Sequence, residues 1–154
     1  MIAAYQDAAR QLDALQEYAY IEAGLTHTAR MIHNLAHEMP KRFDVFADML
    51  HEQHLMAEYP QTPEFPSQYR DMDEVFERLL GALDKVQEAL AGFHKEVENR
   101  MLMPMALLSE ELMLQNSQSR TRFMELWAMY DDPSVSASSF DNWALHLLEG
   151  GDGA

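Results

Sequence analysis

The residues best suited to chemistry lie in the stretch HEQHLMAE, residues 51 to 58. His51, His54 and Glu58 are separated by three and four positions, a spacing that stacks side chains on one face of an α-helix. Two imidazoles and a carboxylate on one face suit iron or zinc. We therefore take these residues as candidate metal ligands, and the alternative that the spacing leaves open is a polar, solvated helix face.

Two further candidates, Glu22 and His27, lie near the apolar positions of the first predicted helix. A buried carboxylate or imidazole is costly unless it is paired or binds a metal. Taken singly, Glu22 fits the edge of an apolar stripe and His27 and His33 fit partly exposed histidines. His37 and His94 are interpreted as surface residues.

The chain has no cysteine, which excludes a zinc finger, a thiol nucleophile and a disulfide framework. Any metal must be held by His, Asp, Glu or Met. Glycine-rich phosphate loops, GxSxG elbows and HExxH zinc motifs are absent as well. Met101, Met103 and Met105 surround Pro104 and could bind Cu(I), but methionines spread along amphipathic helices typically fill gaps in a core.

The charge of the chain limits its partners. It has 26 acidic and 11 basic residues, a formal net charge of -15. A surface this negative repels phosphate backbones and argues against direct DNA binding, whereas it concentrates cations or simply favours solubility. No segment has the apolar length of a membrane span or the pattern of a signal peptide. We expect a soluble, cytoplasmic protein.

Long helices must position the candidate ligands. Apolar residues repeat at helical spacing over about 3–35, from near Pro40 to the proline-containing loop 60–66, from Met72 to Val97, and from near Pro104 to Tyr130. Asn116 and Ser119 interrupt the last stripe, which indicates either a polar bundle centre or a helix irregularity. The pattern predicts an all-α fold, an antiparallel four-helix bundle over residues 1–131. Residues 132–154 are expected to form a polar linker, a short C-terminal helix that Asp141 could cap, and a frayed end.

Residues 27–58, HTARMIHNLAHEMPKRFDVFADMLHEQHLMAE, resemble the first-to-second-helix region of the Dps branch of the ferritin-like superfamily. That family has two histidines twelve positions apart, then an Asp and a Glu four apart. Counted without a gap, the corresponding positions are His27, Met39, His54 and Glu58, so two of the four match. The resemblance in helix order covers about residues 3–131. It implies iron bound between two subunits, with His27 facing His54 and Glu58 of a two-fold mate.

The chain departs from the family at several positions. Met39 is a poor ligand for hard iron, His54 replaces a carboxylate, and Thr28 stands where an aromatic residue is usual. The predicted metal site therefore comprises His27, His51, His54 and Glu58, with iron as the expected metal and zinc as the alternative.

The resemblance also implies a function. We expect Fe(II) binding, ferroxidase activity with peroxide or oxygen, and iron storage for oxidative-stress protection in a homo-oligomer, at least a dimer and by the family's habit a dodecamer. The family's Lys-rich tail is missing, which again argues against DNA contact. The alternative is a ferritin-like bundle without ferroxidase activity that acts as a protein-interaction or structural module.

Overall fold

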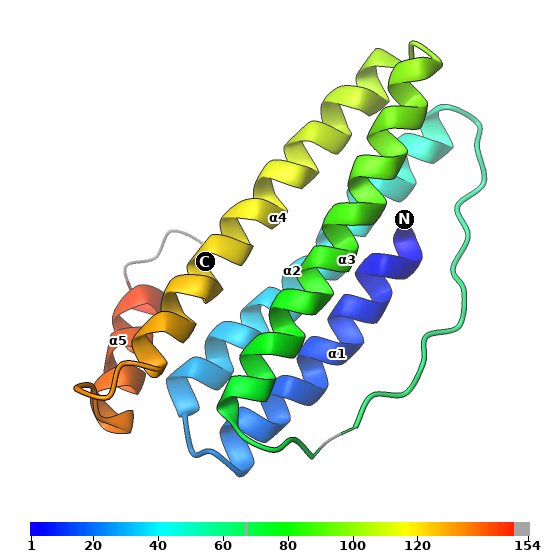
Figure 1. The fold of residues 1–154 in the computed structure, drawn as a ribbon. Coiled ribbons are helices and arrows are strands. Elements are labelled where there is room, and N and C mark those ends of the chain that lie inside the picture. Colours follow the sequence, from blue (N-terminus) through cyan, green and yellow to red (C-terminus); the bar gives the residue numbers. More distant parts are fainter. Residues whose placement is uncertain (67, 150–154) are drawn as a thin grey trace.

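The structure is a computed structural model that describes residues 1–66 and 68–149 (Figure 1). The described residues form helices and no strands, which confirms the all-helical bundle that the apolar periodicity predicts. No helix in these two ranges has the length and apolar character needed to cross a membrane. The helices are α1 (Ile2–Ile21), α2 (Thr26–Glu52), α3 (Met72–Asn99), α4 (Met103–Tyr130) and α5 (Ala137–Glu149).

The long helices are arranged as two hairpins (Figure 1). Short turns join α1 to α2 and α3 to α4, whereas residues 53–66 and 68–71 return along the bundle from the end of α2 to the start of α3. As a result, α2 and α3 run in the same direction. α1 packs against both α2 and α3, and α5 packs against α2 and α4 near the start of α2.

The first helix ends earlier than the periodicity predicts. A helix over about 3–35 is wrong, because the chain breaks between Ile21 and Thr26. Gly24 adopts a φ of 68°, a left-handed conformation that glycine enters without steric cost. The following Leu25 donates its backbone N–H to the carbonyl of Ala19 at 2.9 Å, which reverses the chain.

Pro40 lies inside α2 and does not begin a helix. A proline in a helix interior removes a backbone hydrogen bond and costs about 3 kcal/mol. α2 nevertheless continues, because the same buried stripe runs through Leu35 and Met39 before Pro40 and through Phe46 after it. Packing of that stripe against α1 outweighs the local preference to stop.

The main hydrophobic core extends through the described helices, including α5. A smaller cluster of Val97, Met105 and Ala106 lies near the turn between α3 and α4. The apolar stripe predicted along α3 faces this core from Met72 to Phe93, and its last member, Val97, belongs to the smaller cluster. Every member is buried except the half-buried Phe93. Phe140 and Ala144 of α5 also belong to the core. Asp141 lies within α5 and does not cap it, so that expectation is wrong. The expected frayed end falls at residues 150–154, outside the described residues.

Candidate functional site

His51, His54 and Glu58 do not share a helix face. α2 ends at Glu52, and His54 has a φ of 58° in the segment that follows. A left-handed residue does not continue an α-helix, so offsets of three and four no longer align these side chains. All three residues are exposed. The prediction of one shared helix face is wrong because the helix stops before His54.

His27 lies at the other end of α2 from that stretch. The helical rise of about 1.5 Å per residue places it roughly 36 Å from His51. Its ring is half-buried, and its backbone N–H donates to Oδ2 of Asp141 at 3.2 Å. One copy of the chain therefore does not bring the predicted ligands together. Over residues 1–66 and 68–149, no three His, Asp or Glu side chains are grouped to hold a metal ion.

Met39 and Glu22, two residues considered in the sequence analysis, lie in different environments in the structure. Met39, which replaces a family histidine, is fully buried in the core, so its side chain serves packing. Glu22 caps the C-terminus of α1 and is exposed. Neither residue belongs to a metal site within this chain.

A second set of possible ligands lies on the outer face of α2. His33 and His37 are exposed, one helical turn apart, and their ring centroids lie 4.3 Å apart. Asp44 and Asp48 are also exposed and one turn apart. At about 100° per residue, all four fall within a sector of roughly 60° on the helix. The apolar periodicity predicted a break near Pro40, which separated the histidines from the aspartates, so this face was not predicted from the sequence.

The outer face of α2 has a charge order along its length. Arg30, His33 and His37 occupy its N-terminal half, and Asp44 and Asp48 occupy its C-terminal half. The described part of the chain provides no ion pair to Arg30, Asp44 or Asp48. Arg30, Asp44 and Asp48 are therefore available to form ion pairs with a partner outside the chain.

The centre of the bundle contains a polar layer. Asn116 is fully buried, and its Nδ2 donates to the carbonyl of Leu83 and to Oε1 of Gln87, both at 2.9 Å. Ser119 accepts a hydrogen bond from Nη2 of Arg42 at 3.2 Å. Since α4 runs unbroken past both positions, the structure favours a polar bundle centre over a helix irregularity.

His94 joins α3 to α4 near their connecting turn, so its interpretation as a surface residue is wrong. Its side chain is 19% exposed. Nδ1 lies 2.8 Å from Oγ of Ser109 and 3.2 Å from the carbonyl of Ala106. Nε2 lies 3.1 Å from Glu98 and 3.7 Å from Glu110. Ser109 is buried, so this serine and histidine pair presents no accessible nucleophile.

A carboxyl pair lies where α3 begins and α4 ends. The hydrogen bond that Asp131 donates to Asp73 raises the pKa of Asp131 to about 6, and the negative charges of Asp73 and Asp71 act in the same direction. Hydrogen bonds from Asp131 and from Trp127 lower the pKa of Asp73, whose Oδ1 lies 2.7 Å from Nε1 of Trp127. These two aspartates share a proton more readily than isolated ones.

No protein-family model matches the chain, and no significant relative is found among functionally characterised proteins. Functional inference therefore depends on the helix connectivity and on the side chains of α2.

Proposed function

We propose that this chain is a ferritin-like bundle that pairs through α2 and binds iron between the two copies. Its connectivity supports this class, because ferritin-like bundles contain one long crossover connection. Here residues 53–66 and 68–71 return along the bundle between the end of α2 and the start of α3 (Figure 1). The observation that carries the proposal is the charge order on the outer face of α2.

That charge order is self-complementary under two-fold symmetry. In an antiparallel pair of α2 helices with the axis level with Met39, Arg30 lies level with Asp48 of the partner subunit. Both positions are equally far from Met39 and lie on the same side of the helix. A two-fold contact uses the same surface on both copies, so each ion pair forms twice.

The same pairing assembles a set of metal ligands. His33 and His37 come level with Asp44 of the partner subunit, close to the two-fold axis. Two imidazoles and one carboxylate, with the remaining positions open, suit non-haem Fe(II). The ring spacing within one copy supports the histidine half of this set.

The same pairing would also bring two of the ligands first expected from the sequence to one level of the dimer. His27 and His51 are equally far from Met39, so His27 lies level with His51 of the partner subunit, and His54 and Glu58 follow in the chain. Iron is the substrate in this proposal, and peroxide or oxygen oxidises it as in the Dps proteins. Zinc is the competing metal at a site of this composition.

A complementation experiment tests the shared site. The H33A/H37A variant lacks the histidines and the D44N variant lacks the carboxylate, so neither homodimer holds a complete site. A mixed dimer holds one, because the histidines come from one chain and Asp44 from the other. After unfolding and refolding an equimolar mixture, we expect about a quarter of the wild-type Fe(II) binding under anaerobic conditions.

The outcomes of this experiment separate the possible ligand sets. Binding that neither variant loses would refute the site on the outer face of α2. Loss in both variants without recovery on mixing would refute its division between two chains. H54A and E58A serve as matched controls, since binding lost only in these variants would favour the ligands at the end of α2.

A non-enzymatic interaction module is the second candidate, and one observation favours it. α4 presents apolar residues outward as well as toward the core, with Met103, Leu107 and Leu114 each 59% exposed. A surface helix normally keeps such residues on one face. If the wild-type protein does not bind Fe(II), and if the H33A/H37A variant remains dimeric, this second function is favoured.

A further inference from the structure

A cavity of about 410 Å³ opens between α1 and α2, near the turn that joins these helices. Gln16 and Tyr20 line it from α1. The first turns of α2 provide the rest of its lining, which consists of Thr26, His27, Ala29, Arg30 and His33. Every one of these residues comes from a single chain, so the cavity exists without any pairing of α2 helices.

The lining of this cavity is basic, although the chain as a whole is acidic. His27, Arg30 and His33 follow one another at intervals of three along α2, and no Asp or Glu of the described residues lines the cavity. Arg30 forms no ion pair with another described residue. In a chain with a formal net charge of -15, such a cavity is a local positive region that attracts an anion.

Uncharged hydrogen-bond donors complete the lining. The hydroxyls of Tyr20 and Thr26 and the side-chain amide of Gln16 can each donate to an oxygen of a ligand. The cavity also lies beside the N-terminal end of α2, where the helix dipole is positive. Asp141 already accepts the backbone N–H groups of the first turn, so side chains, not the backbone, would hold a ligand here.

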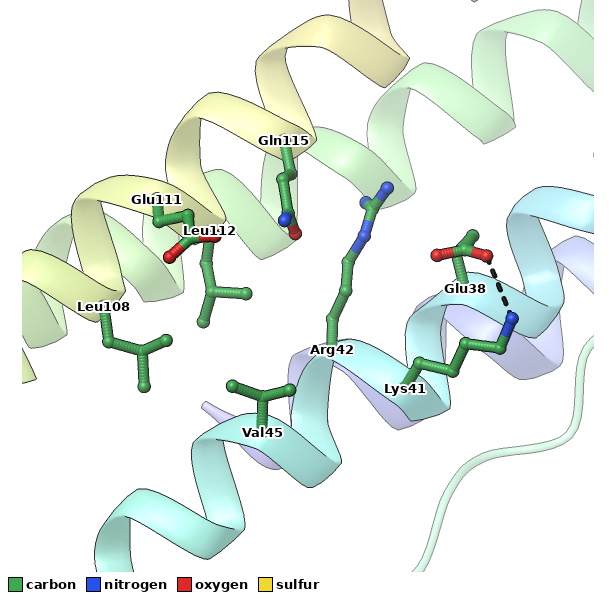
Figure 2. Close-up of a pocket in the computed structure, with 8 residues that line it drawn as sticks. All are labelled: Glu38, Lys41, Arg42, Val45, Leu108, Glu111, Leu112 and Gln115. Carbon is green, nitrogen blue, oxygen red and sulfur yellow. Dashed lines mark hydrogen bonds and ion pairs between the residues drawn. The ribbon is translucent and has the colours of Figure 1, made fainter. Parts of the chain in front are cut away.

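The cleft between α2 and α4 provides a contrast (Figure 2). Glu38 and Glu111 line that cleft together with Lys41 and Arg42. Glu38 accepts a hydrogen bond from Nζ of Lys41 at 3.2 Å (Figure 2). Both signs of charge are present there within one chain, whereas the cavity between α1 and α2 has only basic side chains.

We propose that the cavity between α1 and α2 binds a phosphate group, either as free phosphate or as part of a small phosphate ester. The guanidinium of Arg30 matches two phosphate oxygens in a bidentate pair. Imidazole and hydroxyl donors remain for the other oxygens, and a carboxylate has too few oxygens to use them all. At roughly 30 Å³ per water molecule, the cavity has space for more than about ten waters, which leaves room for an organic group beside Tyr20.

This proposal does not rest on the pairing of α2 helices. The two proposals share Arg30 and His33, because the cavity lies next to the outer face of α2. If α2 pairs, a bound phosphate competes with Asp48 of the partner subunit for Arg30, and phosphate then raises the Kd of the dimer.

Titrations of the metal-free full chain at constant ionic strength, followed in ¹H–¹⁵N NMR spectra, test the site. With inorganic phosphate and with glycerol 3-phosphate, we expect saturable shifts in the amides of Ala29, Arg30 and His33. Tighter binding of glycerol 3-phosphate would identify an ester as the ligand, and equal binding would identify free phosphate. Acetate should bind at least about tenfold more weakly than either, and equal binding of acetate would overturn the proposal.

Two variants test the cavity itself. R30Q should weaken phosphate binding about tenfold or more, because it removes the guanidinium. R10Q is the matched control, since it removes the same charge from an exposed arginine of α1 outside the cavity. Q16W keeps the basic side chains and fills the cavity from α1, so we expect it to abolish binding. Equal weakening by R10Q and R30Q, or unchanged binding in Q16W, would overturn the proposal.

A third variant, D48N, separates this site from the pairing of α2 helices. Asp48 lies outside the cavity, roughly 27 Å along α2 from Arg30, and D48N removes the charge that would compete for Arg30 in a dimer. We expect D48N to bind phosphate at least as tightly as the wild type. Loss of binding in D48N, or no saturable shift at millimolar phosphate in the wild type, would overturn the proposal. Phosphate binding by a chain that stays monomeric would refute only the pairing.

Discussion

Asp141 of α5 caps the first turn of α2 through Thr28. Its Oδ1 accepts hydrogen bonds from the backbone N–H of Thr28 at 2.9 Å and from Oγ1 of Thr28 at 3.0 Å. Leu25, at the N-cap position of α2, provides no side-chain cap. Asp141 of α5 therefore replaces the N-cap side chain, which usually comes from the residue next to the first turn of the helix.

We expect D141A to lower the free energy of unfolding by about 1–2 kcal/mol, because it leaves the first N–H groups of α2 without an acceptor. Urea denaturation monitored by circular dichroism measures this change. N142A is the matched control, since Asn142 is an exposed neighbour on α5. Equal stability of D141A and N142A would contradict the role of the cap.

The pairing of Asp73 with Asp131 predicts that the D131N substitution increases the stability of the folded chain in a pH-dependent way. The pKa of Asp131 is about 6 in the folded chain, above the value of about 3.9 for an unperturbed aspartate. The folded state therefore binds the proton more tightly, and this stabilisation is complete below about pH 4 and is lost as the pH rises through about 6. An asparagine donates to Asp73 at every pH.

We accordingly expect D131N to raise Tm at pH 8 and to leave it nearly unchanged at pH 4. Thermal unfolding at both pH values provides the measurement, and D13N on the exposed face of α1 controls for the loss of one negative charge. A gain of the same size at both pH values, or an equal gain in D13N at pH 8, would contradict this explanation.

Charge reversal tests the pairing of α2 helices without any metal. R30E and D48R should each weaken the dimer, because each places like charges opposite one another. The double variant should recover most of the lost affinity, since both reciprocal pairs form again with their signs exchanged. Sedimentation equilibrium at low salt measures the dimer Kd. No recovery in the double variant would argue against contact between these positions.

The buried side chain of Asn116 should contribute to the stability of the fold. N116A leaves a cavity and removes two hydrogen bonds, and we expect a loss of about 2–3 kcal/mol. N116L fills the space with an apolar group and should cost less. Urea denaturation of both variants, with S117A at an exposed α4 position as control, measures the difference. A larger loss in N116L than in N116A would show that the hydrogen bonds outweigh the packing.

Two glycines should respond in opposite directions to alanine. G24A places a side chain at a φ of 68° and should destabilise the chain by about 1 kcal/mol. G92A lies within α3, where an added Cβ has no atom within 4 Å, and should stabilise it by about 0.5–1 kcal/mol. Thermal unfolding of both variants provides the comparison, and stabilisation by G24A would show that the turn after α1 relaxes.

Residues with a regular local pattern were predictable from the sequence. The stripe from Met72 to Val97 fixed α3, because side chains three and four apart on a helix share one face wherever the helix packs. Pro104 marked the start of α4 for another local reason, since the first turn of a helix is where proline fits without loss of a hydrogen bond. Asn116 and Ser119 were recognisable as polar exceptions in an apolar stripe.

The candidate ligands were harder to place, because their grouping depends on helix ends. The residue types in HEQHLMAE are those of a metal site, but the end of α2 at Glu52 separates His51 from His54. By contrast, α2 continues through Pro40, and this continuity places His33, His37 and Asp44 on one face of the same helix. Both outcomes depend on packing against α1, which local propensity does not contain.

The sequence by itself determined the helical class, the acidic surface and the set of side chains available for chemistry, because composition and periodicity are local properties. Only the tertiary structure decided where the helices end, which side chains share the outer face of α2, and that Arg42 of α2 donates to Ser119 of α4. The physical reason is that burial of an apolar stripe and the distance between two polar groups both depend on residues far apart in the chain.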